Sequence, residues 1–366
     1  MISLRNVLRA PARSIMTAVG VAAGLALFVA ITALTVDVGQ QLEGAVNAYQ
    51  MEVAVYERRA TSPFSSRISP TQMEELQTRY GVLLSPLVVG THNEKWSAYA
   101  LVMGVPSDLL NRIPLTAGAR YEEGSGEVVL GEIAAHKLGV QQGQQLSLDG
   151  REVRVSGIFR TGSRLLDGGL MTDIPHAQQI LTREGAERQY TLAVLRAESK
   201  EAAGVLIDEI NRRYPSLKAI PGTEFAGAHR ALRVVDAFVR TISAVALVGT
   251  CLVVTNTFLM AIAQRTREIG ILMAVGWTPW LVLRMLFAES LVLCITGAAL
   301  GNLLALILLR VVNRMDSIGF GWIPVRFPLA LTGTSLVVAL AVAMIALAWP
   351  AVVLYRMQPL SALRHE

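Results

Sequence analysis

The side chains that most often carry out chemistry are scattered along this sequence of 366 residues. His92, His136, His176 and His229 lack the HExxH spacing in which two histidines on one helix face bind zinc. No GxSxG nucleophile motif, catalytic carboxylate-pair motif or GxxxxGK[ST] phosphate loop stands out in the sequence either. We therefore expect structural or surface histidines, and no catalytic, metal or cofactor site on this chain.

Residues 264–280, QRTREIGILMAVGWTPW, combine charged and apolar side chains at short intervals. The charged residues are Arg265, Arg267 and Glu268, and the apolar ones include Ile269, Leu272, Met273 and Ala274. A helix of this kind can lie at the membrane surface and offer one face to a partner protein. From the residues alone, a plain interfacial helix between two spans is an equally good interpretation.

Two polar residues lie inside apolar stretches. Glu289 follows Arg284 in such a run, and an ionised carboxylate there is costly unless it is paired or hydrated. It could pair with a basic residue of 264–280 or reach the headgroups, and we favour the structural pair over a proton relay because no second intramembrane acid accompanies it. Asn256 is predicted to hydrogen-bond across helices, which contributes about 0.5–2 kcal/mol.

Small residues four positions apart suggest close helix packing. Gly20 and Gly24 form one GxxxG pattern, and Gly297 and Gly301 form another. Glycine lets two helix backbones approach closely, either within one chain or between two copies. The pattern is frequent in membrane helices, so it indicates packing without naming the partner.

The composition requires a lipid environment for part of the chain. Apolar residues make up 52% and charged residues 17%, with a mean hydropathy of +0.45. The net charge of +5 comes largely from arginines beside apolar runs, which argues against nucleic-acid binding. The two cysteines, Cys251 and Cys294, lie in apolar runs and are predicted to be buried and unpaired.

Four charge-free stretches reach the roughly 20 residues that a helix needs to cross a bilayer. They are Ser14–Val36, Thr241–Ala263, Ser290–Leu309 and Phe327–Tyr355. The first is too long for a signal-peptide core and lacks a clear cleavage site, so we interpret it as an uncleaved anchor.

Arginines beside these stretches predict the orientation through the positive-inside rule. Arginines on the predicted cytoplasmic side are Arg5, Arg9, Arg13, Arg265, Arg267, Arg356 and Arg364. One external loop, with Arg310, Arg314 and Arg326, goes against the rule and is outweighed by the other flanks.

The predicted fold class is an α-helical membrane protein with an α+β extracytoplasmic domain inserted between helices 1 and 2. The predicted segments are a cytoplasmic N-terminus (1–13), transmembrane helix 1 (14–37), the outer domain (38–230), transmembrane helix 2 (235–263), a cytoplasmic segment (264–280), transmembrane helix 3 (281–310), an external loop (311–327), transmembrane helix 4 (328–355) and a cytoplasmic tail (356–366).

Alternation and helical spacing predict several elements of the outer domain. Strands are expected at 128–130, 145–148 and 152–159, with a hairpin turn at Asp149-Gly150, and an amphipathic helix at 200–213. A helix from about Glu224 is expected to run into the second span, and Thr61–Pro70 is expected to be a mobile loop.

The segment after the second span resembles the signature of FtsX-like and MacB-like ABC transporter permeases. Its R-E-I-G-x-L-x-A-x-G core is Arg267, Glu268, Ile269, Gly270, Leu272, Ala274 and Gly276, with Glu289 soon after. The opening LRNVLRAPARSIMTAVGVAAG, the block from EVVLGE to GIF and the tail YRMQPLSALRHE are similar to the same family. The likeness covers both ends, the outer domain and the segment between spans.

The resemblance implies a dimer of permeases, with identical or non-identical copies, on cytoplasmic ATP-binding subunits in a bacterial inner membrane. Without a phosphate loop, this chain is expected to leave ATP and Mg²⁺ to a separate ATPase, unlike the fused macrolide exporters. The implied ATPase-coupling residues are Arg265, Arg267, Glu268, Ile269, Gly270, Leu272, Met273 and Gly276. Motion of the outer domain would drive export or extraction of a hydrophobic or periplasmic cargo.

Several functions remain open at this point. Export could use a periplasmic membrane-fusion adaptor and an outer-membrane duct. Alternatives are lipoprotein release by paired permeases and mechanical regulation of a cell-wall hydrolase, for which the outer domain is larger than needed. A membrane enzyme or sensor lacks a supporting motif.

Overall fold

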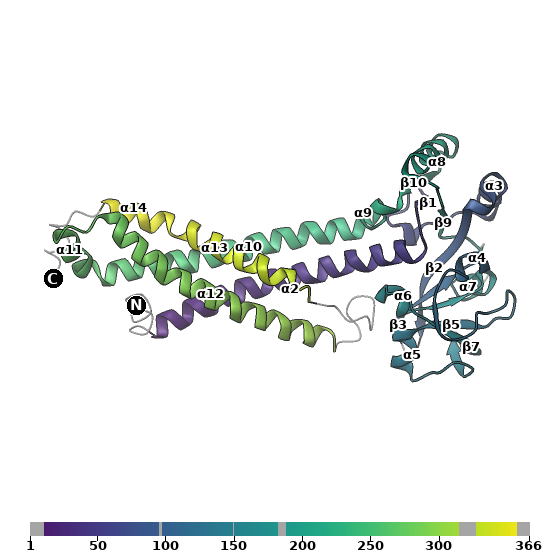
Figure 1. The fold of residues 1–366 in the computed structure, drawn as a ribbon, viewed down its shortest axis with the longest axis horizontal. Helices are drawn as coiled ribbons and strands as arrows, with labels where there is room; N and C mark the ends of the chain where they lie inside the picture. The colour runs from purple at the N-terminus through teal and green to yellow at the C-terminus, as the bar shows by residue number, and fades with distance from the viewer. Residues whose placement is uncertain (1–10, 95–96, 149, 182–187, 315–326, 357–366) are drawn as a thin grey trace. The chain divides into compact units, whose positions relative to one another are not determined.

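The computed structural model describes residues 11–94, 97–148, 150–181, 188–314 and 327–356 (Figure 1). The described residues divide into two compact units. Of the described residues, the helical unit contains 11–35, 236–312 and 327–356, and the outer unit contains those between 36 and 235 together with 313–314.

The helical unit is built from long apolar helices. They are α2 (Pro11–Ala48), whose outer end belongs to the outer unit, α10 (Arg230–Gln264), α12 (Pro279–Val312), and the pair α13 (Ala330–Ala346) and α14 (Ala348–Arg356). Four stretches within them are long and apolar enough to cross a membrane: 14–48, 233–264, 279–312 and 330–356. A short helix, α11 (Thr266–Ala274), connects α10 to α12.

The break between α13 and α14 has a local cause. Pro350 has no amide hydrogen to donate to the carbonyl of Ala346, four residues earlier. That carbonyl instead accepts a hydrogen bond of 3.1 Å from the hydroxyl of Thr255 on α10. The membrane helices are thus joined where the sequence frees a backbone oxygen.

The outer unit contains a ten-stranded mixed sheet. Its strands are β1 (Val53–Glu57), β2 (Leu84–Glu94), β3 (Ser97–Gly104), β4 (Leu115–Gly118), β5 (Val128–Gly131), β6 (Gln145–Leu148), β7 (Arg151–Phe159), β8 (Leu170–Thr172), β9 (Leu192–Leu195) and β10 (Leu217–Pro221). The order is β10-β1-β9-β2-β3-β8-β5-β7-β4, with β6 on β7. The β3–β8 and β5–β7 pairs are parallel and the others antiparallel.

Short helices cover this sheet. They are η1 (Pro63–Ser65), α3 (Pro70–Tyr80), η2 (Gly81–Leu83), α4 (Ser107–Leu110), α5 (Glu132–Leu138), α6 (Arg164–Asp167), α7 (Ile174–Leu181), α8 (Lys200–Arg213), η3 (Gly222–Glu224) and α9 (Phe225–Ala228). Helices α3 and α8 pack on one face of β1, β9 and β10, where Leu76 and Ile210 are fully buried.

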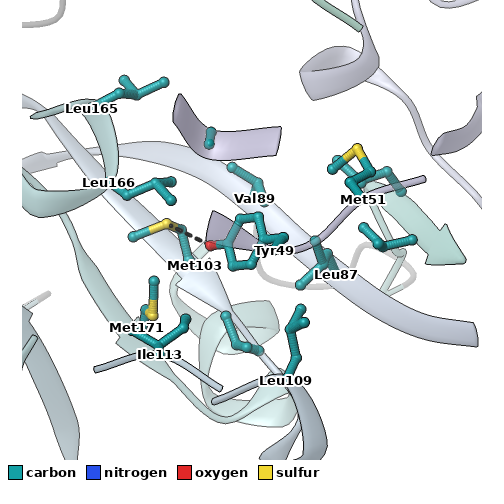
Figure 2. Packing of buried hydrophobic residues seen from close by; sticks show 14 of the residues in the cluster. Tyr49, Met51, Leu87, Val89, Met103, Leu109, Ile113, Leu165, Leu166 and Met171 are labelled. Carbon is teal, nitrogen blue, oxygen red and sulfur yellow. Dashed lines mark hydrogen bonds between the residues drawn. The ribbon is translucent and has the colours of Figure 1, made fainter. Parts of the chain in front are cut away.

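The opposite face holds the largest apolar cluster of the outer unit. The outer end of α2 contributes Leu42 and Ala45 to this cluster, and Tyr49 joins them directly after the helix ends at Ala48. Figure 2 shows Tyr49 reaching into it, where its hydroxyl lies 3.2 Å from the sulfur of Met103. Burial raises the pKa of Tyr49 well above its ordinary value. Helix α2 therefore continues past residue 37 because its last turns are part of the outer core.

The predicted fold class is confirmed: four apolar helices accompany a mixed α/β unit inserted after the first of them. The strands predicted at 128–130, 145–148 and 152–159 and the helix at 200–213 are also confirmed, within a residue at each end. Asp149 of the predicted hairpin turn lies outside the described residues, but Leu148 and Arg151 pair across that turn.

Two local predictions are wrong. Thr61–Pro70 is ordered rather than a mobile loop, because Ser62 and Ser69 cap helices that begin with proline, and Ile68 is fully buried. The helix expected from Glu224 is interrupted: η3 and α9 precede His229, and α10 begins only at Arg230. His229 breaks the helix because its buried side chain bonds to Ser62.

Candidate functional site

The predicted coupling segment folds as α11, with a turn at each end. Arg265 separates it from α10 with φ −115° and ψ 17°. At the other end, the amide of Gly276 donates to the Met273 carbonyl (3.1 Å) and that of Trp277 to the Leu272 carbonyl (3.0 Å). This is the Schellman arrangement, which needs a left-handed residue, and Gly276 supplies a φ of +102°. The glycine is required by the turn before α12.

One side of α11 is buried in the helical unit. Ile269 is 2% exposed, Gly270 is buried, and Met273 packs against the same apolar cluster as Leu286 of α12. Leu272 is half-buried. Ile269 and Met273 are four positions apart and lie on one face of the helix. These side chains therefore hold α11 in place.

The other side of α11 is exposed. It presents Arg267, Glu268, Ile271 and Val275, with Ile271 48% and Val275 77% exposed. These positions follow the three-to-four residue spacing of a single helix face. We call these four residues the α11 outer face. Ile271 and Val275 were not among the residues predicted from the sequence, although their spacing from Arg267 and Glu268 could have indicated them.

An ion pair connects the start of α11 to α12. The guanidinium of Arg265 lies 3.4 Å from the carboxylate of Glu289, and their side chains are 17% and 6% exposed. A buried carboxylate needs such a partner because hydrocarbon does not solvate charge. The structure thus contains the pair that the sequence analysis favoured for Glu289.

Both glycine pairs pack within the chain. A Cβ at Gly20 or Gly24 would meet Val253 at 2.9 Å or Thr250 at 1.9 Å on α10. A Cβ at Gly297 would lie 2.6 Å from Val21, and one at Gly301 would lie 2.9 Å from the carbonyl of Ala22. Helix α2 is therefore held closely between α10 and α12.

Asn256 does not make the predicted contact. It is exposed, and the structure gives it no hydrogen bond to any described residue. Hydrogen bonds across the helices include, besides that from Thr255 to Ala346, the bonds between Thr17 and Thr257 (2.8 Å) and between Asn302 and Ser335 (2.8 Å). Asn256 points away from its own bundle because it lies on the opposite side of α10 from the buried Val254 and Phe258.

The histidines do not form a metal site among the described residues. His176 contacts the hydroxyl of Thr172 at 2.9 Å, and burial lowers its pKa. His229 lies 2.7 Å from the hydroxyl of Ser62 and packs edge-on against Phe64 and Phe225. Burial lowers the pKa of His229 to about 4, so it is neutral at pH 7. Its position anchors the start of α10 to the outer unit.

A buried polar cluster anchors the outer end of α2. Asp37, 1% exposed, is paired with Arg164 of α6 and accepts a hydrogen bond from Gln41. The hydroxyl of Ser163 donates to the carbonyl of Gln41 at 3.0 Å. We call Asp37, Gln41, Ser163 and Arg164 the α2 clamp.

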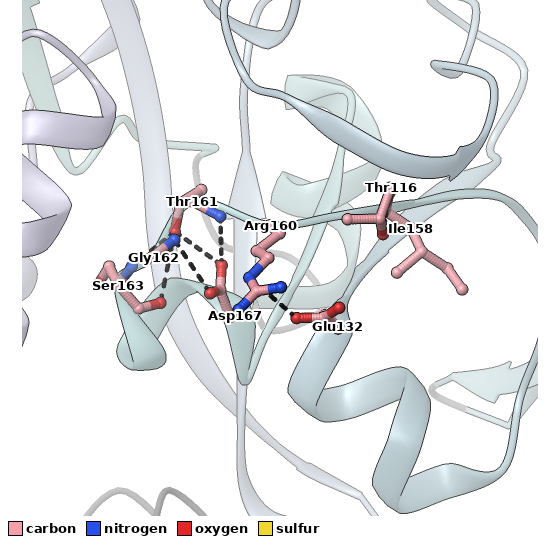
Figure 3. Close-up of polar contacts among 8 residues, drawn as sticks. All are labelled: Thr116, Glu132, Ile158, Arg160, Thr161, Gly162, Ser163 and Asp167. Carbon is pink, nitrogen blue, oxygen red and sulfur yellow. Dashed lines mark hydrogen bonds and ion pairs between the residues drawn. The ribbon is translucent and has the colours of Figure 1, made fainter.

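The turn that carries Ser163 and Arg164 is itself fixed. Figure 3 shows the carboxylate of Asp167 accepting hydrogen bonds from the backbone of Thr161 (2.7 Å) and Gly162 (3.2 Å). Beside it, Arg160 and Glu132 form a more exposed ion pair at 3.2 Å. The clamp therefore sits on a rigid turn, and no single sequence motif indicated it because its residues are far apart in the chain.

Comparison with known families identifies both parts of the chain. Residues 14–213 match the MacB-like periplasmic core domain, and residues 240–359 match the FtsX-like permease C-terminal family. The chain belongs to the MacB-like and FtsX-like family of permeases. It is thus an ABC transporter permease, a multi-pass protein of the inner membrane with a large periplasmic domain.

Named relatives of this permease include macrolide exporters. It is 23% identical to the macrolide export ATP-binding/permease protein MacB of Rhodopirellula baltica, in an alignment that covers 97% of this chain. It is 31% identical to the protein of the same name from Escherichia coli K12 over 26% of the chain. The permease spans 60% of the length of the first relative and 18% of the second.

Proposed function

We propose that this permease passes the closure of a separate ATP-binding subunit through α11 into α2 and α10, and so moves the periplasmic domain. That motion would drive export or extraction of a hydrophobic or periplasmic cargo. The main support is α11 itself, which is fixed to the bundle by Ile269, Met273 and the Arg265–Glu289 pair while its outer face stays exposed. A helix held in this way can transmit a displacement of its outer face to the helices that it contacts.

Two long helices, α2 and α10, could carry this motion to the periplasmic domain. Helix α2 has 38 residues and α10 has 35, so each is about 50–57 Å long at about 1.5 Å per residue. Both exceed the roughly 30 Å of a bilayer core. Within the outer unit, the α2 clamp holds the outer end of α2, and the His229–Ser62 contact holds the residue that precedes α10. We propose that these contacts let helix motion reach the periplasmic domain.

Several partners follow from this proposal. We propose that ATP and Mg²⁺ bind to a partner subunit, which membership of a permease family supports. The names of the relatives support export rather than lipoprotein release or hydrolase regulation. An adaptor and an outer-membrane duct would complete an export path, with the periplasmic domain as their contact.

A second permease copy is the proposed cover for the exposed side of α10. Asn256 lies there with Leu252, 64% exposed, and Met260, 51% exposed. An amide facing hydrocarbon is unfavourable unless it finds a hydrogen-bonding partner in another helix. Oxidative cross-linking of a Leu252→Cys variant, with both native cysteines replaced, tests this contact. A cross-linked dimer is expected, and only monomer would contradict it.

The coupling proposal is tested by affinity purification in mild detergent with identification of the co-purifying chains. Wild type should retain an ATP-binding subunit and its ATP hydrolysis. Glu268→Lys reverses a charge on the α11 outer face and Val275→Asp introduces one. Both variants should therefore lose the ATP-binding subunit and its ATP hydrolysis, while they still insert and fold. Gly270→Leu should also uncouple, because this position is buried.

Two further variants complete the test. Arg213→Glu changes an exposed charge of the outer unit and should retain the subunit. Asp37→Asn weakens the α2 clamp, so it should keep the subunit yet lose transport. Full retention and full transport by both α11 outer-face variants would contradict the proposal.

A further inference from the structure

A pocket lies in the outer unit, outside the contacts described so far. It has a volume of about 740 Å³ and opens where β1 and β10 meet residues 58–61 and the η3–α9 segment. The start of α10 contributes Arg233 to its wall. Small-molecule sites have volumes of about 300–1,000 Å³, so this pocket is of a size that accommodates one organic ligand.

The floor of the pocket is apolar and well packed. Tyr56 and Ile220 line it and are 4% and 5% exposed. In the β1–β10 ladder, Ala54 pairs with Ile220 and Tyr56 pairs with Lys218, so Tyr56, Ile220 and Lys218 lie on one face of the sheet. Because that ladder fixes their positions, the floor is formed before any ligand arrives.

The walls carry an excess of positive charge. Arg58, Arg59, Lys218 and Arg233 line the pocket, and Glu224 is the one carboxylate among its described lining residues. Arg58 is oriented by the carbonyl of Pro215 at 2.8 Å and by the side chain of Asn211 at 3.3 Å, both neutral groups.

These cations lack counter-charges of their own. Among the described residues, the structure gives no ion pair to any of the four. Five other arginines of the outer unit do have carboxylate partners: Arg79, Arg112, Arg154, Arg160 and Arg164. Cations gathered in a concave site with a low-dielectric wall attract anions strongly.

We propose that this pocket binds an amphipathic anion. A carboxylate, sulfonate or phosphate group is held by Arg59, Lys218 and Arg233, and an apolar body lies on Tyr56 and Ile220. Guanidinium groups suit such anions because they donate two parallel hydrogen bonds. The inference goes beyond the proposed function and does not depend on it, since binding requires neither nucleotide nor an ATPase.

The test is fluorescence titration of the full chain in phosphatidylcholine nanodiscs, with empty nanodiscs as the blank. Dansylglycine is the anionic probe, and dansylamide carries the same apolar ring without the charge. Dansylglycine is expected to bind with an affinity that falls as salt is raised. Dansylamide should bind at least about tenfold more weakly, equivalent to about 1.4 kcal/mol.

Matched variants separate the pocket from general surface charge. The double variant Arg59→Gln/Arg233→Gln should lose affinity for dansylglycine by at least about tenfold. Arg151→Gln/Arg188→Gln removes the same charge from exposed positions elsewhere in the outer unit and should bind like wild type. Thermal unfolding followed by circular dichroism checks that both double variants are folded.

Two competition arms complete the experiment. Replacing part of the phosphatidylcholine by phosphatidylglycerol distinguishes the sources: weaker probe binding in wild type supports a lipid headgroup as occupant, and unchanged binding supports a soluble anion. The proposal is overturned if the pocket double variant binds dansylglycine like wild type, or if dansylamide binds equally well. Complete displacement of dansylglycine by an equal concentration of inorganic phosphate would also overturn it, because the apolar floor would then contribute nothing.

Discussion

Removing the ion pair between Glu289 and Arg265 should destabilise the whole of α11. In Glu289→Gln, the guanidinium of Arg265 stays largely buried but loses its carboxylate. Breaking a buried ion pair from one side costs about 3–5 kcal/mol in soluble proteins. We therefore expect hydrogen–deuterium exchange of residues 266–274 to speed up by at least about tenfold in nanodiscs.

The control for this variant is Asp236→Asn, which breaks a more exposed pair with Arg240 at 2.5 Å. Exposed pairs contribute about 0–1 kcal/mol, so exchange in that part of α10 should change little. Equal effects of the two variants would show that burial of the Arg265–Glu289 pair does not stabilise α11.

His229 predicts a pH dependence of the outer unit. Its pKa in the folded protein is about 4, below the ordinary value of about 6.5, so the unfolded chain binds the proton more readily. Its contribution is therefore complete above about pH 6.5 and is lost as pH falls toward 4. The size of that contribution is up to about 3 kcal/mol.

Hydrogen exchange of residues 217–228 measures this effect. Exchange in wild type, corrected for its intrinsic pH dependence, should increase between about pH 6.5 and 4. His229→Gln keeps a partner for Ser62 and should flatten that increase, whereas His136→Gln, at an exposed position, should leave it unchanged. If exchange in His229→Gln still increased as in wild type, the pH dependence would have to come from other titrating groups.

At the scale of elements, helix packing makes a prediction for glycine. A Cβ added at Gly301 of α12 would lie 2.9 Å from the backbone oxygen of Ala22, which cannot move without shifting α2. Overpacking of this kind costs about 1–3 kcal/mol. Gly301→Ala should therefore lower the thermal unfolding temperature in detergent, whereas Gly333→Ala on α13 adds a methyl group in open space. A similar unfolding temperature for both variants would contradict close packing of α2 on α12.

How far an element could be predicted depended on how local its cause is. The 145–148 strand and the 200–213 helix were predictable because alternation and amphipathic spacing are local patterns. The order of the sheet was not, since β1 pairs with β9 and β10, more than a hundred residues later. In Thr61–Pro70, the serine and proline content was interpreted as a loop although the same residues cap and begin helices.

The same distinction holds for the candidate site. Charged residues at 265–268 and the GxxxG pairs stood out by type and spacing. The α11 outer face did not, because Ile271 and Val275 are ordinary residues that matter only through their exposure. The α2 clamp joins residue 37 to residue 164 and was beyond any local pattern.

At the scale of the whole molecule, the coupling proposal requires α11 and the outer unit to lie on opposite sides of the membrane. Among the described residues between 152 and 267, one apolar stretch, 233–264, is long enough to cross a membrane, so we expect a single crossing between them. Cysteines placed at these positions, in a chain with Cys251→Ala and Cys294→Ala, report the two sides. In spheroplasts, a membrane-impermeant maleimide should label the Glu152→Cys variant at once. The Arg267→Cys variant should react only after permeabilisation, because both residues are exposed and only the membrane separates them from the reagent. Equal labelling in intact spheroplasts would place α11 where no cytoplasmic ATP-binding subunit could reach it.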